Sequence, residues 1–214
     1  MEARLDGRAF FFFLRLTFDG RKTLPKHLAA ALALLAAPAL GTPVLAQAPV
    51  EQAADNQELA EMYAQDQEVR QRLLAELKPK EDGSFSVPPE LVMAMVSGDA
   101  QRLARTEEMF RTGALKTAQD YYHAAFIFQH GKEPESYLRA HHAALVAMKL
   151  GHENASWIAA ASLDRYLVNI GQPQIYGTQS KNENGQTVVS EADPDIMPNR
   201  ERGMLDVPPL AGAD

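Results

Sequence analysis

The sequence of 214 residues contains no cysteine. This absence excludes disulfide bonds, thiol chemistry, thiolate metal sites and a lipid-modified cysteine at a processing site. A cysteine-free chain can reside in an oxidising compartment, but its fold must then be stabilised by its core alone. We therefore expect a packed domain without covalent cross-links.

The sequence also lacks a surplus of positive charge. It has 21 basic and 28 acidic side chains, and residues 1–46 hold 6 and 3 of them, which leaves 15 and 25 in the remainder. That remainder carries a net charge of about −10 at neutral pH. Nucleic acids and anionic membranes both favour basic surfaces, so neither is expected as a partner.

A long apolar run is missing as well. Residues 28–35 are Leu and Ala only, which is far short of the roughly 20 residues that a membrane-spanning helix needs. Three basic residues lie in segment 21–26, and small residues follow at 44–46. This order predicts a secretory signal peptide over residues 1–46, cleaved after Ala46, with an uncleaved N-terminal anchor as the alternative. The protein is then expected to be periplasmic or secreted, without an integral membrane span after cleavage.

The signal peptide sets the expected domain organisation. Residues 1–20 precede its basic segment and are interpreted as an N-terminal extension from an over-long gene prediction. Residues 47–56 are rich in Ala, Gln and Pro and are expected to form a flexible tether. Residues 57–210 are expected to form a single helical domain, and residues 193–214 a tail rich in Pro and Gly that wraps the surface.

Apolar residues after position 56 recur at three- and four-residue spacing, which predicts amphipathic helices. Proline, glycine and capping residues divide the pattern, and in particular Gly98 is expected to end one helix and Asp99 to begin the next. The predicted helices are 57–77, 90–96, 99–112, 117–130, 134–150 and 154–171. We therefore expect a mainly α domain of about six helices, packed as antiparallel helical hairpins.

The periodicity changes after Gly171. Residues 174–179 and 187–189 are predicted to be short strands, and Asn184-Gly185 between them is typical of a tight hairpin turn. The domain is therefore expected to end in a small C-terminal β-hairpin that closes over the helices.

Three polar residues, Asp66, Gln129 and Asp164, fall on faces of predicted helices that are otherwise apolar. A buried carboxylate costs several kcal/mol unless it is paired or hydrogen-bonded, and a buried amide also needs partners. Suitable partners occur nearby in the sequence, so we interpret these residues as part of a polar cluster between helices. The candidate site comprises Asp66, Gln67, Arg70, Gln129, His130, Asp164, Arg165, Gln174, Tyr176, Thr178 and Gln179.

Each of the three polar residues also has a structural interpretation. Asp164 can anchor a loop by accepting its backbone N–H groups, Gln129 can satisfy a helix end, and Asp66 can lie on the surface of a frayed helix. The sequence contains no G-x-S-x-G turn, no Gly-rich phosphate loop after a strand and no H-E-x-x-H motif. No metal or cofactor is expected, and the histidines are interpreted as surface or capping residues.

Three hypotheses for the function stay open. The first is a binding module that holds a small polar ligand or a partner protein in a polar groove. The second is a hydrolase-like enzyme that uses Asp164 or Asp66 as general base, with Arg165, Arg70 and Gln179 orienting the substrate. The third assigns the polar cluster a purely structural role. We favour binding, because no nucleophile with an adjacent base is visible.

Two resemblances support parts of this interpretation. Pro134-Glu135-x-Tyr137, Ala144-Leu145 and Leu150-Gly151-His152-Glu153-x-Ala155 resemble tetratricopeptide-type Sel1 repeats, which stack helix pairs into binding scaffolds. Asp66-Gln67-x-x-Arg70, Gln129-His130, Asp164-Arg165 and the Q-x-Y-G-T-Q motif at 174–179 resemble a bacterial family built on a domain of unknown function, over roughly 59–210. This family often carries Gly-Trp-Pro where the present chain has Gly113-Ala114-Leu115. The second resemblance implies one domain with a polar cluster and implies no particular activity.

Overall fold

The structure is a computed structural model that describes residues 3–5, 53–79, 85–183 and 186–213. The predicted signal peptide, apart from residues 3–5, and most of the predicted tether lie outside the described residues. Within the described part, no helix is both long enough and apolar enough to cross a membrane.

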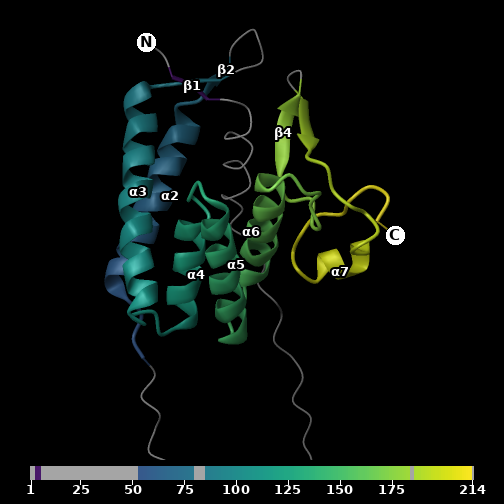
Figure 1. Cartoon of the computed structure of the whole chain (residues 1–214). Coiled ribbons are helices and arrows are strands. Elements are labelled where there is room, and N and C mark those ends of the chain that lie inside the picture. The colour runs from purple at the N-terminus through teal and green to yellow at the C-terminus, as the bar shows by residue number, and fades with distance from the viewer. Residues whose placement is uncertain (1–2, 6–52, 80–84, 184–185, 214) are drawn as a thin grey trace, which may run out of the picture. The chain divides into compact units, whose positions relative to one another are not determined.

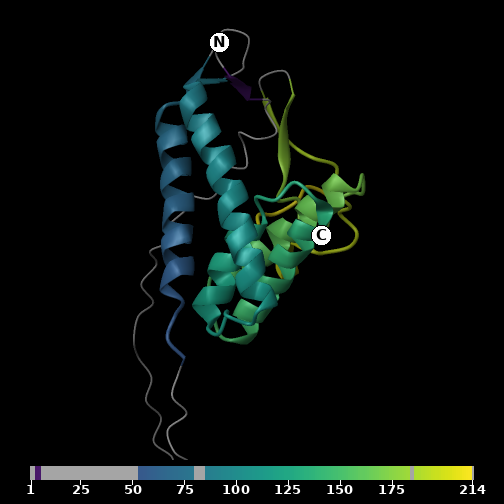
Figure 2. The ribbon, with the colours of Figure 1, turned by 60° about the vertical axis from the view of Figure 1, so that its left-hand side comes forward.

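The described chain is mainly helical, which confirms the predicted fold class (Figure 1). Its six helices are α2 (Gln57–Ala75), α3 (Pro89–Arg111), α4 (Ala118–Phe128), α5 (Pro134–Lys149), α6 (Ala155–Asn169) and α7 (Asn199–Gly203). The long helices α2 and α3 lie side by side and antiparallel, and Figure 2 shows the two next to each other. Helix α5 packs against both α4 and α6, so these three form two successive antiparallel hairpins.

Local capping explains where the helices begin. The Asn56 side chain accepts a hydrogen bond from the backbone N–H of Leu59 at the start of α2. Thr117 and Asp120 form a reciprocal capping box at the start of α4. The Asp120 carboxylate also accepts from the backbone N–H of Asn56 at 2.7 Å, which joins the starts of α2 and α4. Such caps satisfy the backbone donors that a helix leaves free at its first turn.

Helix α3 corrects one prediction. The chain continues as a single helix through Gly98, where two separate helices were expected, and Asp99 is an interior residue instead of a cap. Glycine inside a helix costs only about 1 kcal/mol, which packing against α2 can offset. A Cβ atom at position 98 would lie 2.8 Å from Nη1 of Arg102, so the glycine makes room for a guanidinium.

The C-terminal hairpin is present, but its first strand begins later than predicted. Strand β4 (Ser180–Glu183) pairs antiparallel with β5 (Gln186–Val189), and Ser180 lies opposite Val189. The turn pair Asn184-Gly185 lies outside the described residues. Residues 174–179, predicted to be the first strand, form a loop before β4, because a side chain on α6 binds their backbone groups.

A second small sheet was not predicted. Strands β1 (Ala3–Leu5), β3 (Phe85–Val87) and β2 (Lys78–Pro79) pair antiparallel in the order β1-β3-β2. Strands β2 and β3 belong to the connection between α2 and α3.

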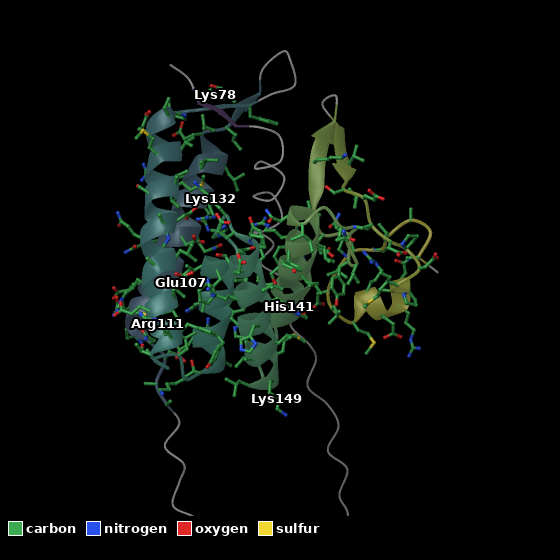
Figure 3. All side chains as sticks on the ribbon, viewed as in Figure 1. Lys78, Glu107, Arg111, Lys132, His141 and Lys149 are labelled. Atoms are coloured by element: carbon green, nitrogen blue, oxygen red, sulfur yellow. The ribbon has the colours of Figure 1, made fainter. Side chains whose placement is uncertain are left out.

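Apolar side chains form two separate clusters. The main cluster joins α2, α3, α4, α5 and α6 through residues such as Leu59, Met109, Phe128 and Ile158, with many alanines that allow the helices to approach closely. The smaller cluster, around Leu73, Val87 and Met95, lies at the far end of the α2–α3 pair. On the surface, Arg139 of α5 pairs with Glu107 of α3 at 2.7 Å; Glu107 is labelled in Figure 3.

Candidate functional site

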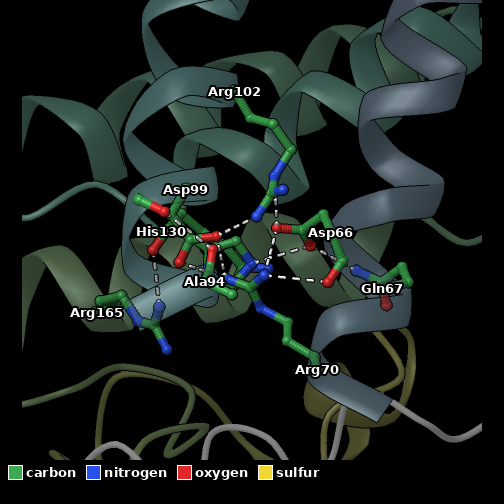
Figure 4. Close-up of polar contacts among 10 residues, drawn as sticks. Asp66, Gln67, Arg70, Ala94, Asp99, Arg102, His130 and Arg165 are labelled. Atoms are coloured by element: carbon green, nitrogen blue, oxygen red, sulfur yellow. Dashed lines mark hydrogen bonds and ion pairs between the residues drawn. The ribbon is translucent and has the colours of Figure 1, made fainter. Parts of the chain in front are cut away.

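Five titratable side chains lie together between the two apolar clusters (Figure 4). Helices α2 and α3 supply two each, and the turn after α4 supplies the fifth. We call Asp66, Arg70, Asp99, Arg102 and His130 the charged cluster. Nη1 of Arg70 donates to Oδ1 of Asp66 at 2.5 Å, and its Nη2 donates to both oxygens of Asp99 at 3.0 and 2.9 Å. Nη2 of Arg102 donates to Oδ1 of Asp99 at 2.6 Å, while its Nε lies 3.6 Å from Oδ1 of Asp66. Each helix thus supplies one acid and one base at three- or four-residue spacing, which places them on one face.

The second oxygen of Asp66 is also occupied. Nε2 of Gln67 donates to Oδ2 of Asp66 at 2.9 Å, and Nε2 of His130 lies 3.4 Å from the same oxygen. Asp66 is only 1% exposed, so its charge is balanced almost entirely by protein groups. The prediction of a polar cluster around Asp66 therefore describes the geometry, whereas the alternative of a surface Asp66 is wrong.

The surroundings shift the pKa values of Asp66 and His130. Burial acts to raise the pKa of Asp66, but His130, Arg70 and Arg102 outweigh it and hold that pKa below its usual range. Burial lowers the pKa of His130, and Arg70 adds to this effect, although Asp66 opposes it. At neutral pH the cluster therefore contains an ionised Asp66 and an uncharged His130.

Arg165 of α6 connects the charged cluster to the C-terminal loop. Its Nη1 donates to the backbone carbonyl of Gln129 at 2.8 Å, next to His130, and its Nε lies 3.4 Å from Oε1 of Gln179. Its guanidinium also lies 5.8 Å from the centre of the Tyr137 ring. Burial lowers the pKa of Arg165 to about 9, with Tyr137 acting to raise it and the charge of Arg70 acting to lower it further.

Asp164 holds the loop 174–179, which we call the anchored loop. Its Oδ1 accepts the backbone N–H groups of Ile175 and Tyr176, both at 2.9 Å. Its Oδ2 accepts the backbone N–H of Thr178 at 2.8 Å and the hydroxyl of the same residue at 2.7 Å. Asp164 is fully buried, so it serves as the acceptor for a stretch of loop backbone, which is the structural interpretation considered for it.

Two glutamines complete the anchored loop. Nε2 of Gln174 donates to the carbonyls of Gln179 and Ser190 at 2.9 and 2.8 Å, and its Oε1 accepts the backbone N–H of Gln179 at 2.6 Å. Nε2 of Gln179 donates to the carbonyl of Ala161 at 3.1 Å and to the hydroxyl of Thr178 at 3.0 Å. Both glutamines of the Q-x-Y-G-T-Q motif thus bind the protein's own backbone.

Arg202 of α7 binds the anchored loop from its other side. Its Nη1 donates to the carbonyl of Ile175 at 3.0 Å, its Nη2 to the carbonyl of Tyr176, and its Nε to the carbonyl of Pro208 at 3.2 Å. Gly177 has φ +61°, and a Cβ atom there would lie 3.3 Å from Nη2 of Arg202. Glycine is therefore required both by the backbone conformation and by the close approach of the guanidinium.

The eleven predicted site residues form two sets of contacts, one around Asp66 and one around Asp164, and Arg165 belongs to the second and donates to the carbonyl of Gln129, the chain neighbour of His130 in the first. Tyr176 takes part through its backbone. Sequence reasoning missed Asp99, Arg102 and Arg202. Asp99 and Arg102 lie three residues apart and Asp66 and Arg70 four, so both pairs have an acid followed by an arginine one helical turn later, a signal that the interpretation of Gly98 as a helix end obscured.

Neither carboxylate proposed as a general base is well placed for that role. Each oxygen of Asp164 already accepts two hydrogen bonds, and both oxygens of Asp66 contact donors on neighbouring side chains. A general base needs an oxygen that can reach a proton of the substrate. These contacts favour binding or structural roles for both residues.

Two buried polar side chains stand out within the part of the chain that the structure describes. Both amide atoms of Gln129, which is 1% exposed, lack a hydrogen-bond partner among the described residues, and so does the hydroxyl of fully buried Thr106. Gln129 is the C-cap of α4 and adjoins His130, and its own carbonyl binds Arg165. Thr106 follows Arg102 by four positions on α3 and therefore shares its face. The alternative in which the Gln129 amide satisfies a helix end is not what its contacts show.

Comparisons with known proteins do not extend this geometry. No family model, no curated protein and no solved structure matches the chain. The two resemblances therefore stay predictions, and the function has to be argued from the site itself.

His142 is exposed and Nδ1 of His152 accepts the backbone N–H of Asn154, as expected of surface or capping residues, whereas His123 differs from that expectation. His123 is 7% exposed, stacks on Tyr63 with ring centres 4.3 Å apart, and its Nε2 lies 2.7 Å from Nε2 of Gln119. His152 stacks on Tyr122 at 3.9 Å. Among the described residues, no group of three or more His, Asp or Glu side chains is arranged to hold a metal ion.

These buried imidazoles predict a domain that is destabilised by acid. Burial lowers the pKa of His123 from 6.5 to about 4, so the folded state binds its proton only at lower pH than the unfolded state does. Its stabilising contribution is complete above pH 6.5 and is lost as the pH falls towards 4, by about 2 kcal/mol at pH 5. Urea unfolding at pH 8 and pH 5 measures this loss.

A variant separates His123 from the other acid-sensitive groups. His123→Phe keeps the stacking on Tyr63 but does not titrate, so its stability should change less between the two pH values. Some dependence should stay, because burial also lowers the pKa of His130 and His152. Exposed His142, changed to Phe as a matched control, should leave the full loss in place. An unchanged pH dependence in His123→Phe would contradict the assignment.

Proposed function

We propose that this protein is an exported binding module that holds a small polar ligand where Gln129, Arg165 and the charged cluster adjoin. The observation that carries the proposal is the amide of Gln129, which is buried with neither polar atom partnered among the described residues. A buried polar group without partners costs about 1–3 kcal/mol. Such groups are rare in native proteins, and a ligand that supplies the missing hydrogen bonds accounts for this one.

The surroundings suit a ligand of this kind. Arg165 of α6 donates to the carbonyl of Gln129, and His130, which follows Gln129 in the chain, lies 3.4 Å from Asp66 of α2. Binding sites built on helices hold their groups with less variation than sites on loops. The anchored loop has a supporting role in this proposal, because Asp164, Gln174 and Arg202 use their polar atoms to hold its backbone.

The predicted signal peptide supports the part of the proposal that assigns this module to the periplasm or the exterior. A hydrolase-like activity finds no supporting observation, since the two carboxylates considered as bases are occupied as acceptors. A purely structural cluster explains Asp164 but leaves the amide of Gln129 without a reason.

The test compares Gln129→Met with the wild-type protein. Methionine has a similar shape and no amide, so without ligand the variant should be as stable as the wild type or up to about 2 kcal/mol more stable. Its melting temperature should not respond to compounds that stabilise the wild type. Thermal melts in millimolar glycolate, glycine, phosphate, glycerol and glucose provide the comparison.

Gln172→Met is the matched control, because Gln172 is exposed and lies after α6. It should keep both the wild-type stability and the wild-type response to each compound. A Gln129→Met variant that is less stable than the wild type by more than about 2 kcal/mol would show that the amide stabilises the fold itself. If, in addition, no compound stabilises the wild type, the proposed function is wrong.

A further inference from the structure

We infer that the outer edge of strand β5 is a docking site for an extended, positively charged peptide segment of a partner protein. The peptide adds a third strand to the C-terminal hairpin by pairing its backbone with that of β5. This edge takes no part in the proposed function, so the two can be tested separately. Three features support the site: the backbone register of the hairpin, the composition of its two strands and the acidic residues that follow β5.

The register of the hairpin leaves backbone groups of β5 open on the side away from β4. Ser190, directly after β5, donates its backbone N–H to the carbonyl of Gln179, directly before β4, at 3.0 Å. Successive residues of a strand direct their backbone groups to opposite sides, so those of Val189 face away from β4. Within the described chain, β5 pairs with β4 alone, and the N–H of Val189 has no hydrogen-bond partner. Unpaired backbone groups of this kind are a template for another strand.

Both faces of the hairpin are exposed beside this open edge. Val188 and Val189 point to opposite faces, because neighbouring residues in a strand alternate, and they are 38% and 46% exposed. In Figure 1 the hairpin extends past the end of α6. A hairpin of two strands is only marginally stable in water, and a third strand stabilises it.

The compositions of the two strands distinguish the edge of β5 from that of β4. Strand β4 reads Ser-Lys-Asn-Glu, and a lysine on an edge strand is a common means of preventing a further strand from pairing. Strand β5 reads Gln-Thr-Val-Val and contains neither lysine nor proline. Its last three residues are β-branched and favour extended structure. An added strand is therefore expected on β5.

The acidic residues after β5 favour a basic partner. Residues 186–199 contain Glu191, Asp193 and Asp195 and no Lys, Arg or His, and both Glu191 and Asp195 are exposed. Acidic surfaces attract segments that carry lysine or arginine and increase their rate of association. A second copy of the protein brings the same acids to the edge, so repulsion between like charges opposes that occupant.

The experiment uses a seven-residue peptide of alternating lysine and valine, blocked at both ends and labelled for fluorescence polarisation. Saturable binding to the purified protein is expected, and hydrogen exchange at the backbone N–H of Val189 should become at least about tenfold slower. A peptide with glutamate in place of lysine has the wrong charge. A peptide N-methylated at every backbone nitrogen cannot donate to the edge. Each of these two controls should bind at least about tenfold more weakly.

Two pairs of variants connect the result to β5. Val189→Pro removes the outward N–H without removing a hydrogen bond to β4, and it should weaken binding at least about tenfold. Val189→Thr keeps the N–H and a β-branched side chain, and it should bind as the wild type does. Glu191→Gln should weaken binding about two- to fivefold, whereas Glu61→Gln, at an exposed position on α2, should have no effect.

Several results would overturn the site or its occupant. Without binding at millimolar peptide, or with equal binding of the N-methylated peptide, strand addition at β5 is wrong. The N-methylated peptide is tested on the unaltered protein, so this result does not depend on how well Val189→Pro folds. Equal binding of the glutamate peptide contradicts the basic partner. A dimer in sedimentation that Val189→Pro abolishes assigns the edge to a second copy instead. Each of these results leaves the proposed function standing, because that function is tested through Gln129→Met.

Discussion

Replacing Asp164 with alanine is expected to lower the free energy of unfolding by more than about 3 kcal/mol. The carboxylate accepts three backbone N–H groups and one hydroxyl in a fully buried position, and all four donors would lose their acceptor. A buried donor without a partner costs about 1–3 kcal/mol. Urea unfolding measures the effect, and limited proteolysis should show earlier cleavage in the anchored loop.

Two further substitutions make this result specific. Asp164→Asn keeps one acceptor oxygen but turns an N–H group towards a donor, so its cost should lie between those of the wild type and the alanine variant. Asp195→Ala, at an exposed position in the same C-terminal segment, should change stability by less than about 0.5 kcal/mol. A higher melting temperature for Asp164→Asn than for the wild type would mean that the buried charge destabilises the fold, and it would contradict the anchoring role.

Asp66→Leu is the second large effect that we expect, at about 3–5 kcal/mol of lost stability. The substitution removes the carboxylate that contacts Arg70 and Arg102, so that one described carboxylate, Asp99, pairs with both buried guanidinium groups. Burying an uncompensated charge is the main source of this cost. Chemical denaturation at neutral pH provides the measurement.

The double variant Asp66→Leu/Arg70→Met tests the cause. It removes one charge of each sign and leaves Arg102 paired with Asp99 at 2.6 Å. The double variant should therefore be more stable than Asp66→Leu alone, which additive effects do not allow. If it is less stable than the single variant, the cluster contributes through packing or individual hydrogen bonds instead of through charge balance.

Much of the fold could be predicted because its determinants are local. Apolar spacing and caps such as Thr117 with Asp120 define helices over a few neighbouring residues. The predicted helix end at Gly98 was wrong because the role of this glycine depends on another helix. The glycine leaves room for the Arg102 side chain, which lies near Asp66 of α2. Helix start and stop signals, which use only neighbouring residues in the sequence, cannot predict a contact between two helices.

The sequence predicted which residues lie in the polar interior better than it predicted the role of each one. An acid or amide on an apolar helical face indicates a polar contact, and this placed Asp66, Gln129 and Asp164 correctly in the interior. Which partner each finds depends on how the helices pack. The sequence pattern therefore could not show that Asp164 binds loop backbone, that Arg202 approaches that loop from the far side, or that the Gln129 amide is left without a partner among the described residues.

The position of the charged cluster between two apolar clusters affects how cooperatively the domain unfolds. Leu59 and Met109 belong to one apolar cluster and Leu73 and Met95 to the other, while the ion pairs on α2 and α3 occupy the helical turns between them. The two ends of this helix pair are therefore coupled through charges as well as through the helix backbones. Disrupting those charges would let the outer end open while the main core stays intact, and the transition would then no longer be two-state.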